Sequence, residues 1–206
     1  EPLVIAVGRA RASVANAIIQ DRGALEPQRQ TATMLFVDIE GFTSMVERMD
    51  PADVLAMLNA WFAQAGKVIV DQGGVINQFQ GDAILATFNL PVEDPDHASA
   101  AIRSALGIRL AAEHSVFAGH QLGCRIGIAT GDVIAGSVGS GQQLAYTVHG
   151  DAVNLAARLE QMNKETGTRI LIAERTAEAC GDEFELEAIG ETPVRGRADA
   201  KVFTVL

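Results

Sequence analysis

Hydrophobic positions along the chain change their spacing several times, and these changes predict alternating strands and helices. Residues 31–38 form an apolar run that ends in Asp38, while residues 74–79 and 83–88 alternate around a tight turn that contains Asp82. A continuous apolar run is typical of a strand covered on both faces, so residues 31–38 are expected to be central in a sheet. The later pair predicts an antiparallel hairpin with Asp82 at or just beyond its tip.

Helical spacing follows each of these segments. A helix is expected to begin at Asp50 and Pro51, because Asp caps helix N-termini and proline fits the first helical turn. Its core-facing stripe is predicted at Leu55, Leu58, Phe62 and Val68. Further helices are expected over residues 95–114, after Asp151 as far as Gly167, and after a strand within residues 168–180, followed by a closing hairpin over residues 184–206.

Small, β-branched and glycine residues alternate over residues 122–140, which we interpret as two strands around a turn near residues 130–132. Glycines in such strands let a backbone or a ligand approach closely. Strands and helices that interleave, with antiparallel hairpins among them, favour an α+β sandwich with a mixed sheet over a doubly wound parallel fold. Residues 1–30 are expected to form a helix and a polar linker outside this core, so the main domain is residues 31–206.

Composition narrows the classes of function. The formal net charge of −10 over 206 residues argues against a general nucleic-acid surface, which needs an excess of Lys and Arg. Cys124 and Cys180 are not in a CxxC pair, so we interpret them as reduced structural thiols. No apolar run reaches the ~20 residues that span a bilayer, so we expect a cytoplasmic domain, which a longer protein could tether to a membrane.

Asp38 and Asp82 are the first candidates for chemistry. Both are acidic residues delivered by a strand end or a turn, and hard cations such as Mg²⁺ take oxygen ligands that they share with substrate phosphates. Two such ions can hold the attacking and leaving oxygens of a phosphoryl displacement. The alternative is that each carboxylate only forms the local hydrogen bonds that make Asp common in turns.

Polar side chains on the helix after Asp151 are a second candidate. Asn154 and Arg158 are at i and i+4, hence on one helical face, where an amide can orient a sugar and a guanidinium can stabilise phosphoryl charge. Arg195 and Arg197 flank a glycine and could grip a phosphate. An ordinary solvated helix face and a solvated hairpin tip are the alternatives. His97, His114, His120 and His149 lack metal-ligand spacing and are read as surface or packing residues.

Four segments taken together, "FVDIEGFTSM", "NQFQGDAILATF", "RIGIATGDVIAGSVGS" and "YTVHGDAVNLAARLE", resemble the class III nucleotidyl cyclase catalytic domain of adenylyl and guanylyl cyclases. The resemblance covers about residues 31–206. It implies a ferredoxin-like α+β domain that works as a head-to-tail homodimer with active sites at the interface. The implied reaction cyclises a nucleoside triphosphate to its 3′,5′-cyclic monophosphate and releases pyrophosphate.

The resemblance also implies roles for individual residues. Asp38 and Asp82 match the family's two metal-binding aspartates, and the backbone carbonyl of Ile39 matches a further ligand to two Mg²⁺ or Mn²⁺ ions per active site. Asn154 matches the ribose-orienting asparagine and Arg158 the transition-state arginine, both offered by the other protomer. The backbone at Phe42 and Thr43 matches the part that wraps the phosphates, consistent with anion binding at a helix N-terminus, and either Arg195 or Arg197 matches a triphosphate-binding residue.

Base recognition is where the chain departs from the family pattern. Adenylyl cyclases typically have Lys, and guanylyl cyclases Glu, at the position of Gln78, while Thr147 at the partner position resembles the bicarbonate-responsive subgroup. Gln can donate and accept hydrogen bonds, so Gln78 with Thr147 could read the adenine edge without strictly excluding guanine. ATP is favoured because the acidic residue expected for guanine is absent.

The hypothesis is therefore an adenylyl cyclase that converts ATP to 3′,5′-cyclic AMP in signal transduction, under an upstream sensor or membrane domain. A guanylyl cyclase and a catalytically silent cyclase-like regulatory module are the alternatives. The second would normally lack a metal aspartate, the Asn or the Arg, and all four are present. A diguanylate-synthesising domain is disfavoured because its GG[DE]EF signature is missing.

Overall fold

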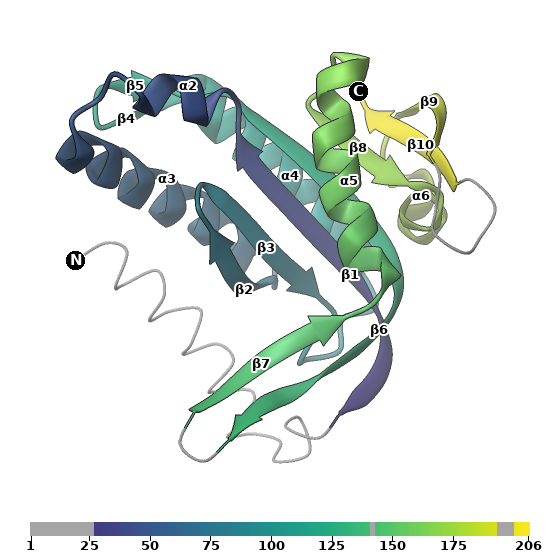
Figure 1. The fold of residues 1–206 in the computed structure, drawn as a ribbon. Helices are drawn as coiled ribbons and strands as arrows, with labels where there is room; N and C mark the ends of the chain where they lie inside the picture. The colour runs from purple at the N-terminus through teal and green to yellow at the C-terminus, as the bar shows by residue number, and fades with distance from the viewer. Residues whose placement is uncertain (1–26, 141–142, 193–199) are drawn as a thin grey trace.

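The computed structural model describes residues 27–140, 143–192 and 200–206, and these form one mixed sheet with helices on both faces (Figure 1). The strand order is β2-β3-β1-β6-β8-β10-β9, and β7 pairs with the far end of β6. The strands are β1 (Gln28–Ile39), β2 (Val75–Gln80), β3 (Ala83–Phe88), β6 (Cys124–Ser140), β7 (Gln143–His149), β8 (Ile170–Ala173), β9 (Leu186–Thr192) and β10 (Ala200–Val205), with β4 (Val116–Phe117) and β5 (His120–Gln121) as a separate pair. The helices are α2 (Phe42–Val46), α3 (Pro51–Asp71), α4 (His97–His114), α5 (Asp151–Thr166) and α6 (Glu174–Cys180), followed by a 3₁₀ turn at Gly181–Glu183.

A ferredoxin-like unit forms the first half of the fold. Its elements follow the order β1-α3-β2-β3-α4-β6, and its four strands lie side by side as β6-β1-β3-β2, each antiparallel to its neighbours. The pairing of β6 with β8 is parallel, which makes the whole sheet mixed. The expected α+β fold with a largely antiparallel sheet is confirmed.

Strand β1 is buried on both faces, as its continuous apolar run predicts. Leu35, Val37 and Ile39 pack into the core cluster that includes residues of α3 and α4, whereas Ala32 and Met34 pack into the cluster that includes residues of α5. Figure 1 shows α4 behind the sheet and α5 in front of it. Because side chains alternate along a strand, Asp38 shares the α5 face with Met34.

Glycine in β6 allows α5 to lie directly on the sheet. A Cβ at Gly127 would come within 2.0 Å of the carbonyl oxygen of Ala156 and 2.4 Å of the amide nitrogen of Glu160. No side chain fits in that space, so the expected close backbone approach occurs between strand and helix.

The interpretation of residues 122–140 as two strands around a turn is wrong. Strand β6 runs without interruption from Cys124 to Ser140. Its pairing with β1 continues through the expected turn, with Thr33 opposite Thr130 and Thr31 opposite Asp132. The glycine there packs against α5, since a Cβ on Gly131 would lie 3.0 Å from Cβ of Ala152.

Helix α3 starts as expected but buries a different stripe. The Asp50 carboxylate accepts a 2.8 Å hydrogen bond from the amide of Ala52, with Pro51 in the first turn. The fully buried stripe is Met57, Trp61, Ala65 and Ile69, at intervals of four residues. Leu55 is 58% exposed, so its assignment to the core stripe is wrong, while Phe62 is buried as expected.

The remaining elements agree closely with the pattern. The β2–β3 hairpin, helix α5 ending at Gly167, strand β8 with α6, and the β9–β10 hairpin are confirmed. Strand β1 begins at Gln28, three residues before the expected Thr31. The helix expected near the N-terminus lies outside the described residues.

Candidate active site

Asp82 lies at the tip of the β2–β3 hairpin, in the two-residue turn between the paired residues Gln80 and Ala83. Gly81 precedes it with a left-handed φ of +63°, which glycine adopts without strain. Strand β3 pairs with β1 so that Ile84 is opposite Val37, and this register carries the turn to the end of β1. The two strands therefore bring Asp82 to Asp38.

The two carboxyl groups are in hydrogen-bond contact, and the pKa of Asp82 is raised to about 7. Partial burial is the largest cause, followed by the hydrogen bond to Asp38 and by the charge of Asp38, while hydrogen bonds from the backbone amides of Asp82 and Ile39 act in the opposite direction. Two carboxylates this close cannot both ionise without a cost, which a cation between them would offset.

Arg125 on β6 lies directly opposite Asp38 on β1, and it is the cation that this chain provides there. Its Nη2 is 3.4 Å from Oδ2 of Asp38, and its Nε donates a 2.9 Å hydrogen bond to Oε1 of Glu160 on α5. The Arg125 and Glu160 side chains are only 7% and 4% exposed. Burial raises the pKa of Glu160, and the hydrogen bond from Arg125 opposes that shift.

Sequence reasoning missed both Arg125 and Glu160. The available signal was the position of Arg125 within the apolar run "CRIGI", since a charged residue inside a buried strand needs a partner. Its partner is 35 positions away on a helix, and only the packing of α5 on β6 brings the two together.

The residues after Asp38 lead into the short helix α2. Ile39 is buried, and Gly41, with φ of 69°, precedes Phe42 at the start of α2. Phe42 is half-buried and packs against the α3 and α4 core, while Thr43 is exposed. The expected start of a helix at this point is observed.

Asn154 and Arg158 lie on the exposed face of α5, with Ala152, Ala156 and Leu159 on its buried side. At 100° per residue, Arg158 is rotated by about 200° from Glu160 around the helix axis. Asn154 is rotated by about 240° in the same sense. Both side chains therefore face away from the Glu160–Arg125–Asp38 cluster of their own chain.

The two residues expected to read the base are on separate strands. Gln78 is exposed on β2, opposite Leu85, beside an irregularity in the β2–β3 register. Thr147 on β7 is half-exposed, opposite Gly136, and its Oγ1 is 3.2 Å from Nε2 of His149. Arg195 and Arg197 fall outside the described residues.

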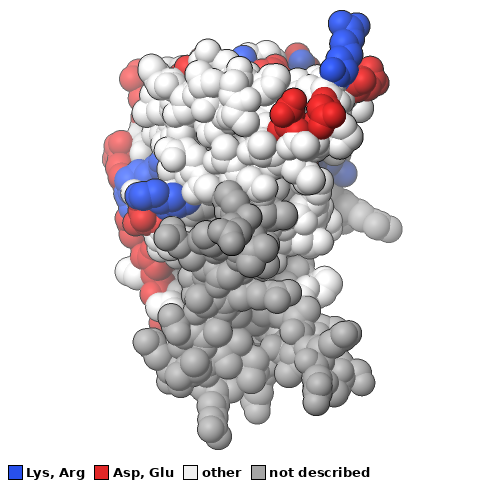
Figure 2. Space-filling model, turned by 90° about the vertical axis from the view of Figure 1, so that its left-hand side faces the viewer, with Lys and Arg blue, Asp and Glu red and all other residues white. Residues whose placement is uncertain are grey.

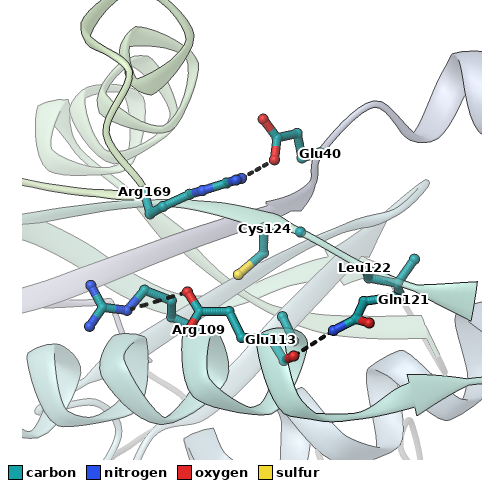
Figure 3. A pocket seen from close by; sticks show the side chains of 9 residues that line it. Glu40, Arg109, Glu113, Gln121, Leu122, Cys124 and Arg169 are labelled. Atoms are coloured by element: carbon teal, nitrogen blue, oxygen red, sulfur yellow. Dashed lines mark hydrogen bonds and ion pairs between the residues drawn. The ribbon is translucent and has the colours of Figure 1, made fainter.

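A pocket of about 300 Å³ lies close to this site but on the α4 side of the sheet (Figure 3). Arg109 and Glu113 of α4, Cys124 and the Glu40–Arg169 ion pair contribute to its lining. Burial raises the pKa of the Cys124 thiol to about 12, so it is a structural thiol and not a nucleophile. Asp38 and Asp82 do not line this pocket, so it is distinct from the carboxylate pair.

The described part of the chain contains no group of three or more His, Cys, Asp or Glu side chains that could hold a metal ion. The candidate metal ligands are thus the Asp38–Asp82 pair and a backbone carbonyl. This set fits Mg²⁺, which is usually bound by one or two carboxylates and completed by substrate phosphates and water.

On the face in Figure 2, the described Lys and Arg residues gather near the edges, beside acidic residues, and do not form a continuous basic patch. In the described residues, no helix is long and apolar enough to cross a membrane.

The family described as "Adenylate and Guanylate cyclase catalytic domain" matches residues 25–206. Adenylate cyclase 1 of Rhizobium meliloti (strain 1021) is 40% identical over 177 residues, which are 84% of this chain and 27% of that protein. Adenylate cyclase of Anabaena cylindrica is 37% identical over 186 residues, which are 86% of this chain and 36% of that protein. The chain thus spans about a third or less of the length of these relatives.

Solved structures agree with the sequence relatives. A bacterial light-regulated adenylyl cyclase superposes with a TM-score of 0.82 at 28% identity, covering 94% of this chain and 57% of that chain. The guanylate cyclase domain of RhGC from Catenaria anguillulae, in complex with GTP, gives a TM-score of 0.78 at 27% identity, covering 87% and 98%.

The raised pKa of Asp82 predicts a pH-dependent stability in metal-free protein. A carboxyl whose pKa is raised by folding stabilises the fold below its unfolded pKa, near 3.8, and loses that contribution as pH rises through about 7. We expect Asp82→Asn to raise the melting temperature in EDTA at pH 8 relative to wild type, with little effect at pH 4. Thermal unfolding followed by circular dichroism measures this, and an equal effect at both pH values would contradict it.

The family match covers residues 25–206. Within them, strand pairing joins Asp38 to Asp82, and one helix carries Asn154 and Arg158. This chain belongs to the adenylyl and guanylyl cyclase catalytic-domain family.

Proposed function

We propose that this domain is an adenylyl cyclase that converts ATP to 3′,5′-cyclic AMP and pyrophosphate in a homodimer with two shared active sites. The proposal rests on one observation: the candidate metal ligands and the other candidate catalytic residues lie on opposite sides of α5. The Asp38–Asp82 pair lies on the side of α5 that packs on the sheet, while Asn154 and Arg158 are exposed on the opposite side. One chain therefore offers two half-sites that face different ways, and a second copy can complete both.

Asp38, Asp82 and the Ile39 carbonyl would hold the divalent ions, Mg²⁺ or Mn²⁺. When bound, such ions neutralise phosphate charge and lower the pKa of a coordinated hydroxyl. The pair of adjoining carboxylates supports this assignment, because it concentrates negative charge, and among the described residues Arg125 forms an ion pair with it, at 3.4 Å from Asp38. We expect two ions per site.

The other half of the site would come from the partner chain. Its Asn154 orients the ribose so that the 3′-oxygen is in line with the α-phosphorus, and its Arg158 stabilises the charge that develops on the α-phosphoryl oxygens. The 3′-oxygen forms a bond to the α-phosphorus, the bond from that phosphorus to the bridging oxygen of the β-phosphate breaks, and pyrophosphate leaves. The 3′-hydroxyl proton is released. The α2 backbone at Phe42 and Thr43, with Arg195 or Arg197, would hold the triphosphate.

Gln78 and Thr147 would read the adenine edge. The amide of Gln78 offers both a donor and an acceptor, which the adenine N1 and N6 positions can pair with. Relatives named adenylate cyclases at 37–40% identity support ATP as the substrate. Guanylyl cyclase activity is the second candidate, since a guanylate cyclase domain solved with GTP has a closely similar fold. A sensor or membrane domain elsewhere in the full-length protein would regulate the dimer.

The direct test is to incubate the purified chain with ATP and Mn²⁺ or Mg²⁺ and to quantify cyclic AMP. We expect Asp82→Ala and Arg158→Ala each to lower kcat by ~10²-fold or more, because each removes charge stabilisation of the transition state. Mixing the two variants should restore about a quarter of the wild-type sites, because half of the random dimers are mixed and each has one intact site.

Two results would contradict the proposal. Full turnover by Asp82→Ala would remove the metal assignment, and an absence of recovery in the mixture, with mixed dimers demonstrated, would remove the shared site. Glu165→Gln is the matched control, because Glu165 is an exposed carboxylate on the same helix as Arg158.

Base choice has its own prediction. Lys can only donate, so Gln78→Lys removes the acceptor that guanine N1–H would use, and we expect the ratio of kcat/KM for ATP over GTP to rise by ~10-fold, the value of about 1.4 kcal/mol. Competition between the two nucleotides measures the ratio. A ratio that is unchanged or lower in the variant would show that Gln78 does not read the base.

A further inference from the structure

A chain of charges that is buried at its inner end connects α5 to Asp38, one of the two carboxylates proposed to bind metal, in the same protomer. Glu160 accepts a 2.9 Å hydrogen bond from Nε of Arg125, whose Nη2 lies 3.4 Å from Oδ2 of Asp38. Exposure rises along this chain, from 4% for Glu160 and 7% for Arg125 to 24% for Asp38. The two deeper groups are therefore shielded from water, and only Asp38 reaches the site.

The geometry of the Arg125 guanidinium lets Glu160 determine which part of Arg125 faces Asp38. The guanidinium is planar and rigid, so a hydrogen bond that fixes Nε also fixes where the terminal nitrogens lie. Glu160 holds Nε, and the position of Nη2 beside Asp38 follows from it. Loss of the Glu160 charge would weaken the bond that holds Nε, so Arg125 would be drawn towards Asp38, whose Oδ2 is 3.4 Å from Nη2.

Helix α5 is held firmly where Glu160 projects. The absence of a side chain at Gly127 lets the backbone at Glu160 approach β6 closely. One turn later, the Asn163 amide donates a 3.0 Å hydrogen bond to the carbonyl oxygen of Ile126, the residue next to Arg125. Glu160 is thus fixed relative to β6 by backbone packing on one side and a buried hydrogen bond on the other.

We propose that Glu160 is a positioning residue that orients Asp38, through Arg125, in its own protomer, while Asn154 and Arg158 of the same helix serve the partner's site. This inference rests on the proposed function and deepens it. Each α5 would then support two active sites, one from its buried face and one from its exposed face, so displacement of α5 affects metal binding in one site and transition-state contacts in the other.

Metal affinity is the first readout. We expect Glu160→Gln to raise the Mn²⁺ concentration that half-saturates the protein by ~10-fold, the usual effect of losing a residue that orients a metal ligand. Electron paramagnetic resonance of free Mn²⁺ measures binding in the presence of 3′-deoxy-ATP, which lacks the attacking hydroxyl. Glu165→Gln makes the same charge change on the exposed part of α5 and should leave Mn²⁺ binding unchanged. An unchanged Mn²⁺ affinity in folded Glu160→Gln would overturn the inference.

Mixed dimers show whether Glu160 acts on the metal ligands of its own chain or on the site that its helix shares with the partner. In the first dimer, an Arg158→Ala chain also carries Glu160→Gln and is paired with an Asp82→Ala chain, so the one intact site uses metal ligands from the chain that lacks Glu160. In the second dimer, Glu160→Gln is moved to the Asp82→Ala chain, so the intact site uses metal ligands beside a normal Glu160. We expect the half-saturating Mn²⁺ concentration for turnover to rise ~10-fold in the first dimer only.

The outcomes distinguish a failure of the Glu160 role from a failure of the shared active site. Equal Mn²⁺ dependence in both dimers would overturn the role of Glu160 while leaving the shared site intact. No turnover in either dimer, or in the mixture without Glu160→Gln, would contradict the proposed function itself. If Glu160→Gln does not fold, Glu160→Asp keeps the charge but moves the carboxylate, and the same difference between the two dimers is expected.

Discussion

Antiparallel pairing of β1 with β3 and β6 is the interaction on which the candidate site depends. The β3 pairing carries the Asp82 turn to the end of β1, and the β6 pairing puts Arg125 directly opposite Asp38. Side chains alternate along a strand, so a slip of one residue in either register would move Asp38 from the α5 face to the α4 face. Burial of β1 on both faces prevents such a slip, because it would also exchange the two halves of the core.

The same strand pairing and the packing of α5 on β6 bring four charged side chains together at one end of β1. Partial burial and the neighbouring Asp38 raise the pKa of Asp82, and Arg125 lies between Asp38 and Glu160. Removal of one partner from a buried ion pair typically destabilises a protein by about 3–5 kcal/mol. Loss of either Arg125 or Glu160 would therefore leave the other as a buried charge without this partner. Clusters that conflict with folding preferences in this way are expected at functional sites.

Local patterns predicted the fold well where each element depended on its own residues. The apolar run of residues 31–38, the alternation around Asp82 and the cap at Asp50 were sufficient to identify β1, the hairpin and the start of α3. Prediction failed where packing decides. Gly131 in β6 was interpreted as a turn because its role, the close approach of α5, depends on a helix later in the chain. Leu55 was assigned to the core because several stripes on an apolar helix look equivalent until the sheet selects one.

For the site, the sequence predicted the carboxylates that converge, but it did not reveal the Arg125–Glu160 pair. Asp38 and Asp82 each belong to a motif that stands out in the sequence, the end of an apolar run and a tight turn, whereas Arg125 and Glu160 become a pair only through the packing of a helix on a strand. The structure adds the orientation of α5, in which Asn154 and Arg158 face away from Asp38 in the same chain, as a site completed by another protomer would require. Dimerisation is consequently part of the chemistry that we propose.

In the arrangement that we propose, one chain carries two incomplete halves of different active sites. The most direct measurement is the specific activity for cyclic AMP formation over a dilution series, compared with the dimer fraction from sedimentation at the same concentrations. We expect activity per chain to fall in proportion to the dimer fraction. Constant activity per chain at concentrations where the protein is monomeric would contradict it.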